Sequence, residues 1–234
     1  TRMWFASIWI HTLRLPWQLG ADIFLKHLID GDPASNTLSW RWVAGLHTKG
    51  KSYLAYPDNI KKFTNGKFYP HKQLATHVKS AKEEDKPLPK QLNFESKLRS
   101  GKKGFLVHES DLSPNFLNGY DMILIQGNPL KSTSKSSLVQ GFISDALKEY
   151  QKKCTENQKC DVSLINLEDS KMIKRLMDEK GLSSLSSNYP AIGAVNDQIQ
   201  KLRNESIIVD YQYQKWDKSF WPHSSKGFFK LKSK

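Results

Sequence analysis

Hydrophobic positions in the first 70 residues recur with the period of α-helices. Residues 3–13 are apolar on nearly every side, which predicts a helix that is buried on most of its faces. Residues 17–29 and 36–46 predict two further helices, and a short helix is expected at 59–63. Since no alternating strand pattern interrupts these segments, the first region is predicted to be all-α.

The predicted stripes and caps of these helices can be checked residue by residue. The second helix should bury one apolar stripe, made of Leu19, Ile23, Phe24 and Leu28. The turn Asp30-Gly31-Asp32-Pro33 should end that helix. Ser35 or Asn36 should cap the third helix, and Asp58 or Asn59 the short one.

The pattern changes in the second half of the chain, where short apolar runs alternate with segments of helical period. The runs predict strands at 120–126, 162–167 and 206–211, and the segments predict helices at 136–152, 170–180 and 190–203. Gly181 should end the middle helix. Strands that alternate with helices predict a small parallel α/β region.

A polar segment separates the two patterns. Residues 71–103 are rich in Lys and contain Pro87 and Pro89, which predicts a linker or a loosely ordered surface segment. The expected division is a helical region at 1–70, a basic linker at 71–115 and an α/β region at 116–234. The last of these ends in an aromatic and basic tail at 216–231.

The excess of positive charge adds a prediction about the binding partner. The chain of 234 residues has a formal net charge of +13, and ten of these excess charges lie in residues 1–105. A basic region suggests a polyanion, most simply nucleic acid. No apolar run reaches the roughly 20 residues that cross a bilayer, so no membrane contact is expected.

The two cysteines exclude a disulfide-stapled secreted scaffold. Cys154 and Cys160 are separated by five residues, a spacing that suits neither a zinc site nor a redox pair. We therefore expect free thiols in a reducing cytoplasm, and no metal. Since the chain starts at Thr1 and enters an apolar segment at once, we also expect it to be a piece of a longer protein.

The residues that suggest chemistry lie in the first 42 positions. They are two aspartates in a tight turn, an arginine one helix earlier, an asparagine and three tryptophans: Asp30, Asp32, Arg2, Asn36, Trp17, Trp40 and Trp42. Taken alone, the tryptophans are typical of a core. Asp30-Gly31-Asp32 alone is typical of a helix-terminating turn, because the distal Glu of a calcium loop is missing.

The spacing of these residues resembles the flavin-binding helical domain of the DNA photolyase and cryptochrome family. The resemblance rests on Arg2-Met-x-x-Ala-Ser7, on Ile29-Asp-Gly-Asp-x-Ala-x-Asn36 and on Trp40-x-Trp42. The offsets also agree: 10 residues from Ser7 to Trp17, 13 from Trp17 to Asp30, and 10 from Asp30 to Trp40. The resemblance covers about the first 70 residues.

The resemblance implies FAD as the cofactor and assigns residues to it. Arg2 and Asp30 match an ion pair beside the isoalloxazine ring, and Asp32 matches a second flavin contact. Asn36 matches the residue that faces flavin N5, where an amide can both donate and accept. Cryptochromes of several lineages differ at that position, so Asn36 favours the chemistry of photolyases.

The resemblance also implies a substrate and an electron route. Trp40 and Trp17 match the inner and middle tryptophans that pass electrons to the flavin. Met3 and Trp42 match the pocket for a flipped pyrimidine dimer, and favour cyclobutane dimers over 6-4 products. The implied protein is a monomeric light-driven repair enzyme for UV-damaged DNA. The alternatives are a cryptochrome-like photoreceptor without repair activity and a degenerate FAD-domain structural module.

The sequence also departs from the family. The usual α/β domain precedes the helical one, whereas the α/β pattern here follows it. The upstream phosphate-binding loop, the adenine contacts and the outer tryptophan have no counterpart in this chain, which puts the strength of FAD binding in doubt. The tail at 216–231 resembles the C-terminus of photolyase-related bacterial proteins with this reversed order. Whether the α/β region holds an antenna chromophore stays open.

Overall fold

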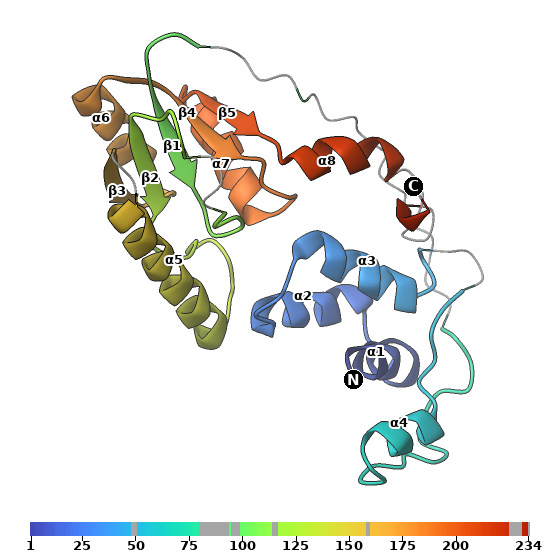
Figure 1. The fold of residues 1–234 in the computed structure, drawn as a ribbon. Helices are drawn as coiled ribbons and strands as arrows, with labels where there is room; N and C mark the ends of the chain where they lie inside the picture. The colour runs from blue at the N-terminus through green and yellow to red at the C-terminus, as the bar shows by residue number, and fades with distance from the viewer. Residues whose placement is uncertain are drawn as a thin grey trace. The chain divides into compact units, whose positions relative to one another are not determined.

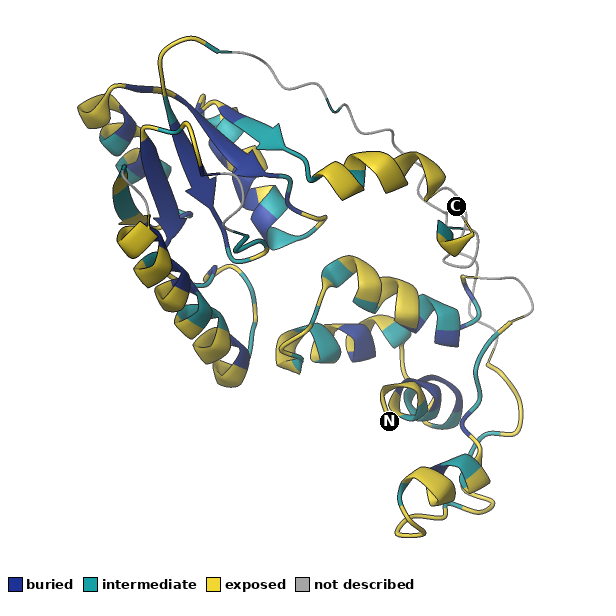
Figure 2. Cartoon of the chain, in the orientation of Figure 1, coloured by how far each residue is buried: buried dark blue, intermediate teal, exposed yellow. Residues whose placement is uncertain are grey.

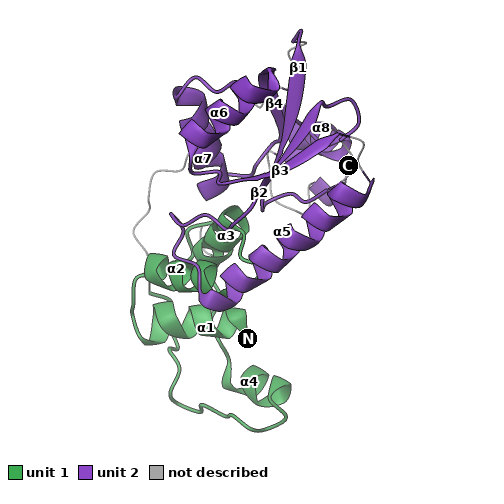
Figure 3. Cartoon of the chain, turned by 90° about the vertical axis from the view of Figure 1, so that its left-hand side faces the viewer, with its two compact units in different colours: residues 1–87 green, residues 88–234 purple. Residues whose placement is uncertain are grey.

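The computed structural model describes residues 1–47, 51–79, 94, 99–113, 117–157, 160–224 and 231–233. The chain divides into two compact units, a helical unit at 1–87 and an α/β unit at 88–234 (Figure 3). Residues 80–93 and 95–98 of the predicted linker, which include Pro87 and Pro89, lie outside the described residues. Across the described ranges, no helix is both long and apolar enough to span a membrane.

The described part of the helical unit contains α-helices and one π-helical turn (Figure 1). They are α1 (Arg2–Ser7), the π-helix η1 (Ile8–Thr12), α2 (Trp17–His27), α3 (Pro33–Val43) and α4 (Pro57–Phe63). The helical character predicted for this region is confirmed. The single predicted helix at 3–13 is instead divided, because its second half adopts the wider π-helical turn.

Two predicted helix starts are wrong, and proline explains both. α3 begins at Pro33, and Asp32 caps it by accepting a hydrogen bond from the Ser35 amide at 2.6 Å. α4 begins at Pro57, with Tyr56 at the N-cap position. Proline suits the first helical position because its φ is already helical and its missing N–H costs nothing there.

The buried face of α2 also differs from the predicted stripe. Leu19 and Ile23 are 58% and 38% exposed, whereas Gly20 and Ala21 are buried. A Cβ atom on Gly20 would lie 2.2 Å from the ring of Trp40. α2 therefore meets α3 through its smallest residues, because only these allow so close an approach.

The first helix is less buried than its composition suggests. Met3 and Phe5 are 43% and 41% exposed, and Leu13 is 57% exposed. The buried positions are Ala6, Ser7, Ile10 and His11. The prediction of burial on most faces is wrong, because the described part of the unit provides one packing face and leaves the other uncovered.

The α/β unit is built on a parallel sheet of five strands in the order β3-β2-β1-β4-β5. The strands are β1 (Lys102–Val107), β2 (Met122–Gln126), β3 (Asp161–Ile165), β4 (Leu182–Asn188) and β5 (Val209–Gln212). The helices are α5 (Ser137–Asn157), α6 (Ser170–Lys180), α7 (Ala194–Asn204), α8 (Lys215–Phe220) and the 3-10 turn η2 (Trp221–His223). The predicted parallel α/β character is confirmed.

The sheet forms the core of this unit. All five residues of β2 are buried, and Figure 2 shows the central strands in the colour of buried residues. One apolar cluster gathers Leu106, Leu124 and Leu185, and a second gathers Phe105 and Ile123. Parallel strands that are covered on both faces become continuously apolar, as in β2.

Two strands were absent from the sequence prediction. β1 starts inside the predicted linker, and β4 is the serine-rich segment LSSLSSN. Ser184, Ser186 and Ser187 are nevertheless buried in β4. Neither strand shows a strong local pattern, so their place in the sheet is decided by pairing with neighbours that are distant in sequence.

Candidate functional site

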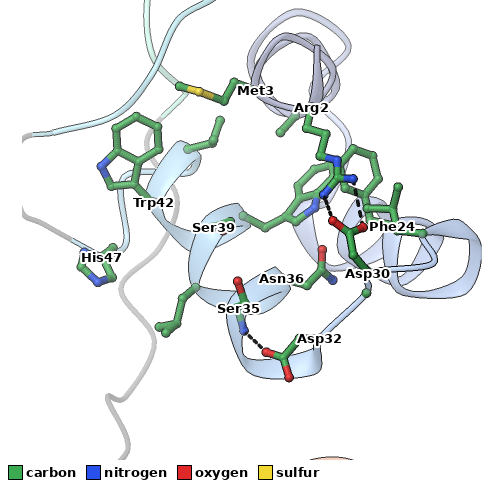
Figure 4. Close-up of a pocket in the computed structure, with 16 residues that line it drawn as sticks. Arg2, Met3, Phe24, Asp30, Asp32, Ser35, Asn36, Ser39, Trp42 and His47 are labelled. Atoms are coloured by element: carbon green, nitrogen blue, oxygen red, sulfur yellow. Dashed lines mark hydrogen bonds and ion pairs between the residues drawn. The ribbon is translucent and has the colours of Figure 1, made fainter. Parts of the chain in front are cut away.

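A cleft of about 790 Å³ opens in the helical unit between α1, α2 and α3 (Figure 4). Sites for cofactors and small molecules commonly measure roughly 300–1,000 Å³. All of the predicted site residues except Trp17 line it: Arg2, Met3, Asp30, Asp32, Asn36, Trp40 and Trp42. Residues near the N-terminus and residues of the 30–42 segment therefore line the same cleft.

An ion pair stands at the edge of the cleft. The guanidinium of Arg2 donates two hydrogen bonds to the carboxylate of Asp30, at 3.0 and 2.9 Å. The hydrogen bond with Arg2 lowers the pKa of Asp30, and the same bond raises the pKa of Arg2. Since both side chains are more than half exposed, the pair adds little to stability and remains accessible to a ligand.

Asp32 shapes the turn beside this pair. Its carboxylate caps α3, which fixes the start of that helix at the lining of the cleft. Gly31 lies between the two aspartates, and a Cβ atom there would come within 2.9 Å of the Leu28 carbonyl oxygen. A side chain at Gly31 would therefore force the turn away from α2, so glycine is required at this position.

Asn36 presents an amide on the first turn of α3. Its Nδ2 donates to the carbonyl oxygen of Ala21 at 2.8 Å, which holds the side chain against α2. Within the described residues no donor is bonded to its Oδ1. The orientation of the amide follows from this bond. The oxygen is thus left as an acceptor in the lining of the cleft.

Trp40 closes the base of the cleft. It is 2% exposed, and the ring of Phe24 meets it edge-on at 5.0 Å between centroids. Its indole Nε1 is buried and has no hydrogen-bond partner in the described structure. A buried donor without a partner is uncommon in folded proteins, and it marks a place where a ligand group could accept a hydrogen bond.

Met3 and Trp42 contribute an apolar part of the lining. Trp42 stacks on Tyr53, with 6.0 Å between ring centroids and 23° between planes. Met3 is 43% exposed. Both residues are labelled in Figure 4, where they lie away from the Asp32 turn. The cleft therefore has one end with charged and amide groups and another with apolar groups.

Trp17 lies outside the cleft lining. The guanidinium of Arg41 lies over its ring at 5.9 Å, and the residue packs partly buried against the core of the helical unit. Conversely, the sequence prediction of the site missed Phe24, which both lines the cleft and contacts Trp40. Its helical spacing identified it only as a core residue.

Comparisons with known proteins agree with this geometry. Residues 1–80 match the family described as the FAD binding domain of DNA photolyase. The chain is 51% identical over 47 residues to the deoxyribodipyrimidine photo-lyase of Streptomyces griseus, which covers 20% of this chain and 10% of that protein. It is 40% identical over 52 residues to the photo-lyase of the same name from Salmonella typhimurium, covering 22% and 11%.

The cleft is thus part of a flavin-binding domain. Residues 1–80 are similar to the FAD-binding domain of DNA photolyase, and this match indicates FAD as the cofactor. The matches span about a tenth of the length of these curated relatives. No solved structure matches the chain.

The residues present fit a flavin. The cleft combines a polar rim, an acceptor on Asn36, an unsatisfied indole N–H on Trp40 and an aromatic base, which suits a planar heterocycle with polar edges. No group of His, Cys, Asp and Glu suited to a metal ion occurs in the described ranges.

Proposed function

We propose that this protein is a FAD-dependent, light-driven enzyme of the photolyase type that repairs cyclobutane pyrimidine dimers in DNA. The observation that carries the proposal is the cleft itself. It brings the Arg2–Asp30 pair, Asn36 and Trp40 together within the residues that match the FAD-binding family. When bound, FAD supplies light absorption and the single electron that returns after the dimer splits.

The polar end of the cleft has the groups needed to hold the flavin. Arg2, paired with Asp30, offers a cationic edge to carbonyl oxygens of the ring system. Asn36, whose Nδ2 is bonded to Ala21, would offer its amide oxygen as an acceptor at flavin N5. Asp32 keeps the start of α3 in place beside them.

The apolar end has the groups needed for an extruded base pair. Trp42 offers a ring face, supported from behind by its stacking on Tyr53, and Met3 offers a partly exposed thioether. Flipping a damaged base pair costs less than flipping an intact one, because the lesion is already poorly stacked. Electron supply to the flavin is assigned to Trp40, which lines the cleft, and to Trp17, which packs against the same core cluster.

The partner is UV-damaged DNA. Ten of the thirteen excess positive charges lie in residues 1–105, which include the cleft, and phosphates bind to such charge without regard to sequence. We also propose that the protein acts as a monomer in the cytoplasm. Gel filtration of the purified chain, before and after FAD is added, tests the first of these two statements.

The test has two stages. The purified chain is first titrated with FAD in the dark, and bound flavin is followed by absorption. An oligonucleotide with a single thymine dimer is then illuminated with the reduced holoprotein, and the repaired strand is measured. Flavin binding without repair would favour a photoreceptor. Absence of flavin binding would favour a structural module and overturn the proposal.

A pair of variants separates the lesion pocket from the flavin site. Trp42→Ala should lose most of its preference for dimer-containing DNA while it retains bound flavin. Phe142→Ala is the matched control, because it removes an aromatic ring that is 54% exposed on α5 of the α/β unit. It should change neither the preference for dimer-containing DNA nor the bound flavin. Equal loss of lesion preference in the two variants would remove Trp42 from the proposed site.

A further inference from the structure

A second surface of the helical unit carries exposed rings and positive charge. It consists of α4 and the turn that follows it, and we call it the 56–72 surface. Its exposed aromatic side chains are Tyr56, Phe63, Phe68, Tyr69 and His71, and its lysines are Lys61, Lys62, Lys67 and Lys72. None of the residues that line the cleft belongs to the 56–72 surface, so the two are separate sites.

The rings of this surface stay open to solvent. Phe63 is 68% exposed, Phe68 55%, Tyr56 62% and Tyr69 45%. Figure 2 shows α4 largely in the colour of exposed residues, whereas Ile60 is buried beneath it. Large exposed apolar groups that gather in one place mark an interaction site more often than isolated ones do.

The turn holds these rings in a defined arrangement. The hydroxyl of Thr64 donates to the Ile60 carbonyl at 2.7 Å and accepts from the Phe68 amide at 3.2 Å. The chain reverses through Asn65 and Gly66, both with positive φ, and the Gly66 amide donates to the Lys61 carbonyl. Since the backbone bonds are satisfied locally, the rings need not pack on one another to keep the turn folded.

The lysines of this surface lie among its rings, and three of them lie over an aromatic face. Lys61 lies over Tyr69 at 4.8 Å, Lys62 over Phe63 at 5.4 Å and Lys67 over Phe68 at 5.5 Å. Within the described residues none of these three makes an ion pair. The nearby acidic group, Asp58, is hydrogen-bonded to Tyr69 and raises the pKa of that phenol.

We infer that the 56–72 surface binds unpaired nucleotides of a nucleic-acid strand, with bases stacked on its rings and phosphates on its lysines. Interleaved aromatic rings and cations are the general means by which proteins hold single strands without sequence preference. An anionic membrane would also attract the lysines. However, the exposed apolar groups here are all rings, whereas helices that lie in a membrane surface also insert aliphatic chains such as Leu.

This inference deepens the proposed function and rests on it for the identity of the polymer as DNA. A strand that is opened around a flipped base pair has unpaired neighbours that need a partner. The surface provides one at a place other than the cleft. Its binding needs no lesion, no flavin and no light, so the test below is independent of repair.

The test uses the full chain in the dark, without FAD, and a fluorescent oligothymidylate of about 15 nucleotides, the upper range bound by one single-strand module. Anisotropy measures the affinity at several salt concentrations. Phe63→Ala/Phe68→Ala should weaken binding at least about fivefold, because each stacked base contributes substantially. Phe68→Tyr retains a ring and should bind like the parent chain.

Charge is tested separately from stacking. Replacing Lys61, Lys62 and Lys67 by Gln should reduce the slope of log affinity against log salt by about 2, since each phosphate contact to a single strand contributes about 0.7. Phe142→Ala, on α5 of the α/β unit, is the matched control and should change neither quantity. Thermal unfolding of each variant establishes that the fold is intact.

Two results would overturn the inference. One is an unchanged affinity of the Phe63→Ala/Phe68→Ala variant for oligothymidylate. The other is a selective loss of binding to phosphatidylserine vesicles in that variant, with oligothymidylate binding retained, which would assign the surface to membranes. If the repair assay fails while Phe63→Ala/Phe68→Ala still weakens oligothymidylate binding, the surface stays assigned and only the proposed enzyme activity is overturned.

Discussion

The two units use large side chains in opposite ways. The α/β unit buries them, and the strand residues Leu106, Ile123 and Leu124 are 0% exposed. The helical unit leaves Met3, Phe5 and Leu19 between 41% and 58% exposed and brings α2 and α3 together through Gly20. A sheet covered on both faces is a complete core, whereas the helical unit keeps its larger groups available for binding.

The largest difference in stability is expected between a leucine of the buried sheet and a leucine of the exposed helix face. Leu124→Ala in β2 should lower the free energy of unfolding by about 2–5 kcal/mol, because it leaves a cavity in a filled core. Leu19→Ala in α2 should stay within about 0.5 kcal/mol, because the side chain is mostly exposed. Guanidinium unfolding measures both, and similar losses in the two variants would contradict the comparison.

Replacing a helical glycine by alanine should change the free energy of unfolding in opposite directions in the two units. Gly20→Ala should destabilise the helical unit by about 1–3 kcal/mol, since the new methyl group would overlap the ring of Trp40. Gly141→Ala, in α5, meets no atom within 4 Å and should stabilise by about 0.5–1 kcal/mol. Thermal unfolding tests both, and a stabilising Gly20→Ala would refute the close packing of α2 on α3.

The helix caps allow a matched comparison of structure and function. Asp32→Ala and Asp169→Ala each remove a carboxylate cap, from α3 and from α6, and each should cost about 1 kcal/mol. Only Asp32→Ala should also weaken FAD binding, because Asp32 lines the cleft. Asp32→Asn retains a capping oxygen and should recover the stability. Flavin loss in Asp169→Ala would contradict the assignment of the site.

The smallest effect on stability is expected at the exposed ion pairs. Arg2→Gln and Lys153→Gln each break a pair with side chains that are 59–67% exposed, so neither should shift the unfolding midpoint measurably. Arg2→Gln alone should reduce the affinity for FAD, measured by titration in the dark. Equal flavin affinity in both variants would remove the Arg2–Asp30 pair from the binding site.

Much of the helical unit could be predicted from local signals. The Asp30–Asp32 turn and the spacing of Arg2, Asn36 and Trp40, through the resemblance they carry, identify residues that meet at the cleft. Trp17 has the same kind of signal but lies outside the lining. Spacing along a helix defines a direction for a side chain, whereas the cleft wall depends on how two helices cross.

The sequence by itself determined the all-α and parallel α/β characters, because periods of 3.6 residues and short apolar runs are local properties. The tertiary structure alone decided which faces are buried. It placed small residues of α2 against Trp40, and it recruited β1 and the serine-rich β4 into the sheet. These outcomes depend on contacts between distant segments, which hydrophobic periodicity does not encode.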